Sequence, residues 1–345
     1  MLGMSLILAV LAFGVSAWLT RRLSNPESRL YMLDHPNPRS LHDSPTPRGG
    51  GLAVLVAVFG FGALALMTHT ANTDLLWMVL GAFLVAVVSF LDDWLTLNLG
   101  YRIVIHFAVA SLLVWGGFTL ESIMVPGAAW VLPAPALIAL SLLFIVWMVN
   151  LYNFMDGMDG FAAGMAVIGF GSFAILGWLD SQPLFATLNL IVAAGAGGFL
   201  LSNFPPARIF MGDVGSSLLG FLAAAFMLWA DRDRIFPLWL GVIVFSPFIL
   251  DATITLIKRI LRGEKFWEAH KTHYYQRLVQ LGWGHRRTVL WEYGLMLLCA
   301  LSALLARFVD PATQWGIIGV WLLVCFFVAL AVHRLETRYN TVLTR

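Results

Sequence analysis

The stretch that decides the fold, residues 134–160, reads APALIALSLLFIVWMVNLYNFMDGMDG. Its first part, up to Val149, is strongly apolar and predicts a membrane-spanning helix. Its second part carries two amides and two carboxylates at three-residue spacing, namely Asn150, Asn153, Asp156 and Asp159. Four such side chains at the end of an apolar helix indicate more than solvation of that end.

These side chains offer only oxygen ligands, which suit a hard cation that is shared with substrate phosphates. The sequence therefore predicts Mg²⁺, with Mn²⁺ as an alternative, at the catalytic face of a membrane enzyme that acts on a diphosphate. A capped loop is the other interpretation, because Asn, Asp and Gly commonly form turns. Turn formation accounts for Asp156-Gly157 and Asp159-Gly160, but not for all four polar side chains.

The composition excludes a typical soluble domain. Of the 345 residues, 60% are hydrophobic and 12% are charged, whereas about 25% charged residues are usual in soluble domains. The two cysteines, Cys299 and Cys325, lie in apolar runs, which makes a disulfide framework or zinc site improbable. We expect membrane lipids and small substrates as partners, and no nucleic acid.

Apolar runs long enough to cross a hydrocarbon core of about 30 Å recur along the whole chain. Their residues are 2–20, 49–67, 75–91, 102–118, 134–150, 161–179, 184–202, 214–230, 236–257, 288–306 and 313–332. The prediction is an all-α polytopic membrane protein with about eleven transmembrane helices, forming one membrane-embedded domain over residues 1–345. One of the runs could instead be re-entrant, and the first is interpreted as an uncleaved helix because it lacks a basic leading segment.

The basic residues fix the predicted orientation. With the N-terminus in the periplasm, 18 of the 21 lysines and arginines fall on the cytoplasmic side, and only Arg232, Arg234 and Arg307 remain outside. The C-terminus is then cytoplasmic, in a bacterial inner membrane. The same parity puts the polar loops on the cytoplasmic side, over residues 21–48, 92–102, 150–160, 203–215 and 258–287. These loops are the predicted active-site loops.

An adjacent pair of carboxylates, Asp92 and Asp93, ends the third run. Adjacent carboxylates beside lipid repel each other unless a cation lies between them, so the pair predicts a metal-phosphate or base role. A solvated helix end is the alternative. Arg102 begins the next run and could hold a phosphate or anchor the helix at the interface.

The loop after residue 203 carries Asn203, Phe210 and Asp213. Asp213 precedes Gly215-Ser216-Ser217, and a helix that begins there could be capped by Asp213 or receive phosphate at its N-terminus. Phe210 is expected to be an exposed aromatic residue that either stacks on a base or packs at the interface.

The most basic loop contains His270-Lys-Thr-His273-Tyr-Tyr-Gln-Arg277. Two histidines could bind a transition metal, but no third ligand lies nearby. A polyanion site explains the surrounding lysines and arginines better. An ordinary loop that holds anionic lipid headgroups is the alternative.

Taken together, these loops resemble the polyprenyl-phosphate N-acetylhexosamine-1-phosphate transferases over residues 42–277. The segments that carry the resemblance are Thr46-Pro47-Arg48-Gly49-Gly50-Gly51, Asp92-Asp93, the run from Asn150 to Gly160, the loop from Asn203 to Ser216, and the histidine loop. The resemblance implies transfer of a sugar 1-phosphate from a UDP-N-acetyl sugar to undecaprenyl phosphate, with release of UMP. Whether the reaction has one step or passes through an aspartyl-phosphate stays open, as do the amino sugar and a homodimer.

The resemblance also implies residue roles. It assigns Mg²⁺ to Asn153 and Asp213, uracil recognition to Asp159 and Phe210, and the acceptor phosphate to Asp92 and Asp93. We expect catalytic roles for Asp92, Asp93, Asp156 and Asp213. We expect substrate binding by Asn150, Asp159, Phe210, Arg102, Asn203, His270, His273 and Arg277.

The His-x-x-His pattern of this chain, in place of a histidine triplet, is more similar to enzymes that start O-antigen or related surface polysaccharides than to the branch that makes the first lipid intermediate of peptidoglycan. That peptidoglycan branch is the nearest alternative. An ion-coupled transporter is more distant, because its carboxylates would lie near the midplane, often within inverted repeats. A CDP-alcohol phosphotransferase is also disfavoured, since Asp159-Gly160 is not followed by the expected Ala-Arg.

Overall fold

The computed structural model describes residues 2–36, 40–68, 73–95, 98–265 and 270–343. The helices are α1 (Leu2–Leu23), α2 (Gly51–Met67), α3 (Asp74–Leu95), α4 (Leu99–Trp115), α5 (Ala134–Phe154), α6 (Phe161–Leu179), α7 (Pro183–Asn203), α8 (Asp213–Arg232), α9 (Leu238–Val244), α10 (Ser246–Leu261), α11 (Tyr274–Leu278), α12 (Gly284–Ala306) and α13 (Pro311–Leu343). A π-helical turn, Val279–Trp283, joins α11 to α12.

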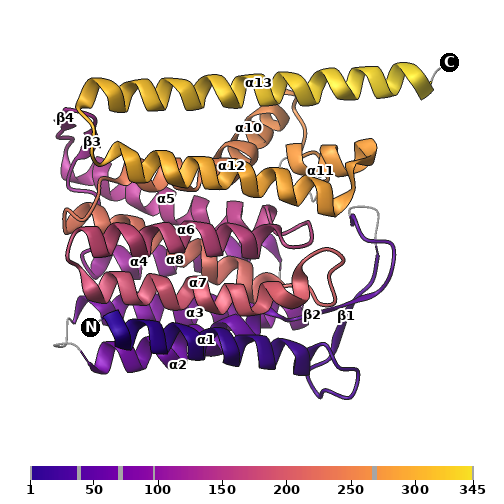
Figure 1. The fold of residues 1–345 in the computed structure, drawn as a ribbon, viewed down its shortest axis with the longest axis horizontal. Coiled ribbons are helices and arrows are strands. Elements are labelled where there is room, and N and C mark those ends of the chain that lie inside the picture. Colours follow the sequence, from indigo (N-terminus) through magenta and orange to yellow (C-terminus); the bar gives the residue numbers. More distant parts are fainter. Residues whose placement is uncertain (1, 37–39, 69–72, 96–97, 266–269, 344–345) are drawn as a thin grey trace.

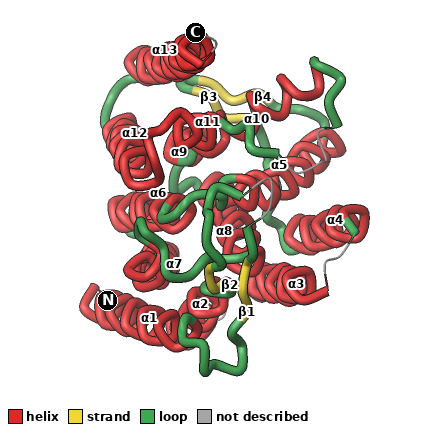
Figure 2. The backbone as a smooth tube through the Cα atoms, turned by 90° about the vertical axis from the view of Figure 1, so that its right-hand side faces the viewer, coloured by secondary structure: helices red, strands yellow, loops and turns green. Residues whose placement is uncertain are grey.

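The long helices lie side by side with their axes roughly aligned (Figure 1). The N-terminus lies at one end of the bundle and the C-terminus at the other. Seen end-on, α8 occupies the middle and α13 the edge (Figure 2). The burial of these helices agrees with this arrangement: the apolar stretch of α8 is 94% buried, whereas that of α13 is 11% buried. Small residues let α8 approach its neighbours: a side chain at Gly220 would come within 2.5 Å of the Met148 carbonyl oxygen of α5.

Two short antiparallel hairpins close opposite ends of the bundle. Strand β1 (Met32–Asp34) pairs with β2 (Thr46–Arg48) at the C-terminal end, and β3 (Ile123–Val125) pairs with β4 (Ala128–Trp130) at the N-terminal end. The sequence reading did not predict these strands, which have only three residues each. The all-α class is otherwise confirmed.

Eight helices are long and apolar enough to cross a membrane, and α9 with α10 forms a ninth candidate, among the residues that the structure describes. The predicted run 236–257 is not one straight helix. It bends by 83° between α9 and α10, where Phe245 ends one helix and Ser246-Pro247 begins the next. Proline has no backbone N–H to continue a helix but is well tolerated in its first turn. The apolar helices α2 and α4, with 17 residues each, are shorter than the eight spanning candidates.

Several predicted loops are in fact helix ends. Helix α5 continues to Phe154, so Asn150 and Asn153 lie on its last turns, and Asp92 and Asp93 lie within α3. Hydropathy locates only the apolar part of a helix, and therefore the runs ended too early. The predicted loop segments also include residues 37–39, 96–97 and 266–269, which lie outside the described residues.

Candidate active site

Predicted site residues from α3, α4, α5 and α8 contact one another beside β2. Arg102 joins two of the carboxylates. Its Nη1 lies 2.9 Å from Asp92 Oδ2, and its Nη2 lies 3.3 Å from Asp213 Oδ2. Residues from three helices, separated by up to 121 positions in the chain, therefore form one charged cluster.

Asn153 completes this cluster from α5. Its Nδ2 donates hydrogen bonds to Asp213 Oδ1 at 2.8 Å and to Ser216 Oγ at 3.0 Å. The amide oxygen of Asn153 is thus turned away from Asp213 Oδ1. Ser216 lies one turn into α8 and was not among the predicted site residues, although its loop was.

Asp93 is buried against the start of α8 and beside Arg48. Its Oδ2 accepts a hydrogen bond from the Val214 N–H at 3.4 Å, and its Oδ1 lies 3.8 Å from Arg48 Nη1. Arg48 Nη2 also donates to the Asp93 carbonyl oxygen at 2.5 Å. Arg48 is therefore a site residue that the predictions omitted, even though it lies within the Thr46–Gly51 segment that supported the resemblance.

Arg48 reaches this position because Gly50 and Gly51, which follow it, pack closely against the start of α8. The Gly50 and Gly51 N–H groups donate to the carbonyl oxygens of Phe210 and Met211 at 2.9 and 2.8 Å. A side chain at Gly51 would come within 2.3 Å of the Gly215 nitrogen. Only glycine permits this approach of β2 and α2 to the start of α8.

Asp156 lies just beyond α5 and is half-buried. Burial raises the pKa of its carboxyl group well above the usual range, and the charges of Asp213 and Asp93 raise it further. Asp92, Asp93 and Asp213 each lie beside a guanidinium group of Arg48 or Arg102, and the charges of Asp93 and Asp213 act on Asp156. The four carboxyl groups outnumber the two guanidinium groups, and this excess of negative charge favours binding of a cation.

The donor set fits Mg²⁺ in chemistry. Asp213 and Asn153 are in direct contact and carry hard oxygen ligands, and such a pair usually holds Mg²⁺ together with substrate phosphates and water. Within the described ranges, no group of three or more His, Cys, Asp or Glu side chains forms a complete metal site. A cation here would therefore need substrate oxygens to complete its coordination.

Asp159 connects the loop after α5 to the loop after α7 and to the start of α12. Its Oδ2 accepts the Ala207 N–H at 2.9 Å, and its Oδ1 lies 3.0 Å from His285 Nδ1 at the start of α12. The other ring nitrogen of His285 lies 3.3 Å from the Leu41 carbonyl oxygen. The Asp159 N–H also donates to His285 Nδ1, at 3.4 Å. No sequence signal pointed to His285.

Asn203 has a structural explanation. Its Oδ1 accepts the Gly160 N–H at 2.9 Å, and its Nδ2 donates to the Ile209 carbonyl oxygen at 2.9 Å. Both ends of this buried amide are occupied by backbone groups. Asn203 therefore holds the loop after α5 against the loop after α7, and its predicted role in substrate binding has no support from these contacts.

Phe210 differs from its expected environment. It is half-buried rather than exposed, and its ring centroid lies 4.8 Å from that of His42. Its N–H donates to the Pro47 carbonyl oxygen at 2.8 Å. The packing arises because the loop after α7 runs beside β2. One face of a nucleotide site at Phe210 would thus be formed by the segment around His42.

The histidine segment is anchored by Asp251 of α10. Asp251 Oδ1 accepts the Tyr274 N–H at 2.9 Å, its Oδ2 accepts the Tyr275 N–H at 3.1 Å, and its Oδ1 lies 3.3 Å from His273 Nδ1. Tyr275 in turn donates its hydroxyl to the Phe154 carbonyl oxygen at 3.1 Å. The segment is therefore fixed against the end of α5, beside the carboxylate cluster.

His270 and Arg277 are placed differently from each other. The ring of His270 lies 4.9 Å from that of His273. Burial lowers the pKa of His270 to about 4, with a further contribution from the nearby His273 and Arg259. Arg277 instead forms an ion pair with Glu336 of α13 and lies over the Tyr274 ring at 5.1 Å. The contacts of Arg277 attach α13 to the bundle and do not include the carboxylate cluster.

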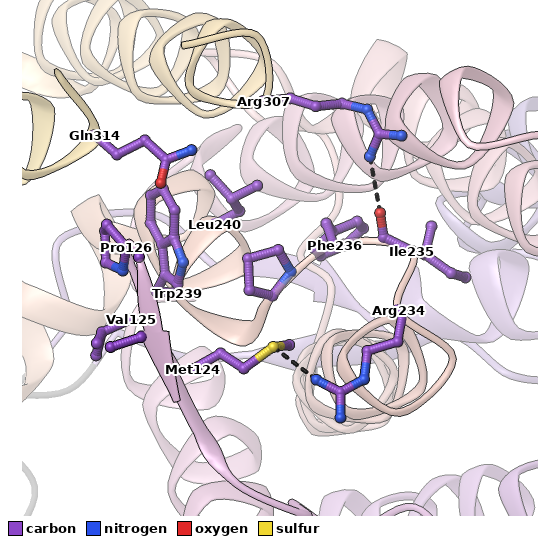
Figure 3. A pocket seen from close by; sticks show the side chains of 13 residues that line it. Met124, Val125, Pro126, Arg234, Ile235, Phe236, Trp239, Leu240, Arg307 and Gln314 are labelled. Carbon is purple, nitrogen blue, oxygen red and sulfur yellow. Dashed lines mark hydrogen bonds between the residues drawn. The ribbon is translucent and has the colours of Figure 1, made fainter. Parts of the chain in front are cut away.

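A cavity of about 300 Å³ (Figure 3) lies beside the β3–β4 hairpin, which is at the other end of the bundle (Figure 1). Its lining includes Met124 and Pro126 of the β3–β4 hairpin region, together with Trp239, Arg234 and Arg307. The arginines bond to other protein atoms there: Arg234 to the Met124 sulfur and Arg307 to the Ile235 carbonyl oxygen. None of the predicted site residues lines this cavity, so it is separate from the chemistry.

Comparison with known proteins identifies relatives along nearly the whole chain. The profile of glycosyl transferase family 4 matches residues 75–231. The probable undecaprenyl-phosphate N-acetylglucosaminyl 1-phosphate transferase of Bacillus subtilis is 32% identical, covering 96% of this chain and 93% of that protein. The decaprenyl-phosphate N-acetylglucosaminephosphotransferase of Mycobacterium leprae is 31% identical, with 91% and 86% covered. The phospho-N-acetylmuramoyl-pentapeptide-transferase of Halalkalibacterium halodurans is 29% identical, with 73% and 81% covered.

The similarity to these enzymes extends well beyond the loops that carry the sequence motifs. It confirms the predicted resemblance, and it sets aside both the transporter and the CDP-alcohol phosphotransferase alternatives. The chain belongs to the superfamily of polyprenyl-phosphate sugar-1-phosphate transferases, and it is a membrane enzyme of the sugar-phosphate transferase class.

Proposed function

We propose that this enzyme transfers N-acetylglucosamine 1-phosphate from UDP-N-acetylglucosamine to undecaprenyl phosphate and releases UMP. The observation that carries the proposal is the cluster in which Arg102 bridges Asp92 and Asp213 at one end of an apolar helix bundle. Such a cluster can receive a diphosphate from water and a lipid phosphate from the bilayer. The choice of N-acetylglucosamine follows the names of the two relatives that align over most of this chain.

In the proposed reaction, an oxygen of the lipid phosphate attacks the β-phosphorus of the donor. The bond from that phosphorus to the oxygen bridging the two donor phosphates breaks, and UMP leaves with the electron pair. The lipid then carries a diphosphate that ends in the sugar. A phosphate monoester is already mostly ionised at pH 7 because its second pKa is about 6, so the acceptor needs positioning more than deprotonation.

The residues have distinct proposed tasks. Asp92 and Asp93 would orient the acceptor phosphate, while Arg102 and Arg48 would exchange part of their carboxylate contacts for phosphate oxygens. Asp159 and Phe210 would receive the uracil, and His270 and His273 would contact the donor phosphates or sugar. The catalytic role of Asp156 and the substrate-binding roles of Asn150, Asn203 and Arg277 stay predictions.

Asp213 and Asn153 would hold Mg²⁺, with Mn²⁺ as the alternative. When bound, the cation would neutralise charge on the donor diphosphate and on the departing UMP. Asn153 would have to turn its amide oxygen toward the ion, because its Nδ2 contacts Asp213 Oδ1 in this structure.

The proposed topology has eleven spans, with α2 and α4 counted and α9–α10 taken as one broken span. An odd number agrees with termini at opposite ends of the bundle (Figure 1). With the N-terminus in the periplasm, the carboxylate cluster faces the cytoplasm, where UDP-sugars are made. The membrane would be the bacterial inner membrane.

The product would start a lipid-linked surface polysaccharide of the O-antigen type, as the His-x-x-His segment suggests. The second candidate is the muramoyl-pentapeptide branch, which is favoured by relatives such as that of Halalkalibacterium halodurans. That relative aligns over less of this chain than the two N-acetylglucosamine enzymes do.

The decisive experiment measures UMP release by the purified protein with undecaprenyl phosphate, Mg²⁺ and a panel of UDP-N-acetyl sugars that includes UDP-muramoyl-pentapeptide. We expect activity with UDP-N-acetylglucosamine that requires both lipid and cation. Asp213→Asn should reduce the rate about 100-fold or more, as expected when a charge acting on the transition state is removed. Asp310→Asn, just before the start of α13 and outside the carboxylate cluster, is the matched control and should retain full activity. UMP release only with the pentapeptide donor would establish the second candidate instead.

A further inference from the structure

Helix α4 carries a polar residue that neither the motifs nor the proposed mechanism uses. His106 lies one turn beyond Arg102 and is only 4% exposed. A buried imidazole within an apolar helix is costly unless its nitrogens find partners. Its position on the same face as Arg102, about 6 Å further along the helix axis, places it on the membrane side of the carboxylate cluster.

The partner of His106 is Asn150, whose Nδ2 lies 3.2 Å from His106 Nδ1. The same Nδ2 donates to the Val146 carbonyl oxygen at 2.7 Å. A carbonyl oxygen can only accept, so the group of Asn150 that contacts Val146 must be the NH₂ group. It follows that His106 Nδ1 accepts a hydrogen bond from Asn150 and carries no proton.

This contact determines the state of the whole ring. With Nδ1 as the acceptor, the imidazole is neutral and its proton resides on Nε2. No partner for Nε2 occurs in the part of the chain that the structure describes. The charged groups that act on the ring are Arg102 and Asp213, both members of the cluster. His106 Nε2–H is therefore a hydrogen-bond donor beside the carboxylate cluster, and no protein acceptor in the described residues uses it.

We propose that His106 is a substrate-binding residue whose Nε2–H donates a hydrogen bond to the phosphate of the polyprenyl acceptor, with Asn150 as the positioning residue that fixes its tautomer. This inference rests on the proposed function. The acceptor is favoured over the donor because its phosphate enters from the bilayer and His106 lies on the membrane side of Arg102. A neutral donor also adds a phosphate contact without placing a second cation against the guanidinium group.

The test uses three variants of the full-length protein in detergent with defined lipid. His106→Phe keeps a ring of similar size but removes the donor. His106→Gln keeps an N–H group near the position of Nε2. His333→Phe removes a solvent-exposed histidine of α13 and is the matched control.

Initial rates of UMP release are measured against undecaprenyl phosphate at saturating donor, and then with the two substrates exchanged. For His106→Phe we expect the KM for undecaprenyl phosphate to rise about 10- to 100-fold, the range for one hydrogen bond to a charged group. The KM for the UDP-sugar should stay within about threefold, as for a residue that does not contact the donor. His106→Gln should recover most of the acceptor affinity, and His333→Phe should match the wild type.

A direct binding measurement separates this inference from the proposed function. Undecaprenyl phosphate is titrated without donor, and undecaprenol serves as the lipid that lacks the phosphate. Phosphate-dependent binding that weakens in His106→Phe would support the inference even if no UDP-sugar released UMP, which would overturn only the proposed reaction. Unchanged lipid binding in a folded His106→Phe protein, or a KM change confined to the UDP-sugar, would overturn the role of His106.

Discussion

The carboxyl group of Asp156 lowers the stability of the folded protein when it is ionised. Asp156 is held close to Asp213 and Asp93, and its pKa is raised well above the usual range by burial and by their charges. A carboxyl group in this position binds a proton more tightly in the folded protein than in the unfolded chain. Its ionisation then opposes folding, and a cation bound beside it would offset this opposition.

The first prediction concerns Asp156→Asn. In the unfolded chain an aspartate titrates near pH 3.9, whereas in the folded protein its pKa is higher. Between these two pKa values the folded state binds the extra proton, so the stability contributed by this group falls as the pH rises. We expect Asp156→Asn to unfold at a higher temperature than the wild type at pH 8, with chelator and without substrate, and to be much less active.

Thermal unfolding from pH 5 to pH 8, followed for both proteins in one detergent, measures this effect. The decline with pH should be shallower in the variant, since one opposing titration is gone. An Asp156→Asn protein that is less stable than the wild type at pH 8 would show that the ionised carboxylate stabilises the fold.

The sequence predicted which carboxylates and amides lie together better than it predicted which side chains they contact. Asp92, Asp93, Asn153 and Asp213 were expected to meet, and they do, because their positions at helix ends could be read from hydropathy. The bridging by Arg102 spans residues from α3, α4 and α8, and the sequence contains no signal for such a pairing. Conversely, Asn203 has a polar side chain that could bind a ligand, but its amide forms hydrogen bonds with two backbone groups. Only the path of both loops reveals that.

At the scale of elements, the bend between α9 and α10 organises the histidine segment. The 83° bend directs α10 so that the Asp251 carboxylate accepts the first two backbone N–H groups of α11. A straight helix over residues 236–257, as hydropathy predicts, would not present Asp251 in this way. The break is local, at Phe245 and Pro247, and an apolar run does not disclose it.

The second prediction is that Asp251→Leu releases the histidine segment. The variant removes the acceptor for two backbone N–H groups and the partner of His273. We expect the KM for the UDP-sugar to increase about tenfold or more, since buried donors left unpaired cost about 1–3 kcal/mol each. Trypsin should also cleave faster after Lys271.

Glu264→Gln is the control for Asp251→Leu, because it weakens only the ion pairs with Arg259 and Arg262 just beyond the end of the same helix. Such pairs contribute little, and activity should be retained. Normal donor affinity in Asp251→Leu would mean that the histidine segment does not contact the donor.

At the scale of the whole molecule, the two ends of the bundle differ in chemistry. One end carries the carboxylate cluster and β1–β2, and the other carries β3–β4 and the cavity of Figure 3. Hydropathy predicted that the carboxylates lie together at one end, and the orientation assigned from arginine and lysine stays a prediction. The two hairpins were beyond prediction, because three-residue strands carry too little periodicity to be recognised.

The third prediction tests the orientation. In a protein whose Cys299 and Cys325 are replaced by alanine, single cysteines are introduced at Ala129, in β4, or at Arg262, beyond α10; both positions are exposed. A membrane-impermeant thiol reagent applied to intact spheroplasts should label Ala129→Cys. It should reach Arg262→Cys only after the membranes are opened. The opposite labelling pattern would place the carboxylate cluster on the outside.

The short helices α2 and α4 have a consequence for the surrounding lipid. Each has 17 residues, which span about 26 Å at 1.5 Å per residue, less than the roughly 30 Å of a typical hydrocarbon core. They lie on either side of α3 in Figure 2, and both begin at the end that carries Asp92 and Arg102. Lipids on this flank must compress to match them. We therefore expect the acyl-chain length of the host bilayer to affect turnover, which should be fastest in vesicles of short-chain lipids whose thinner hydrocarbon core matches these two helices.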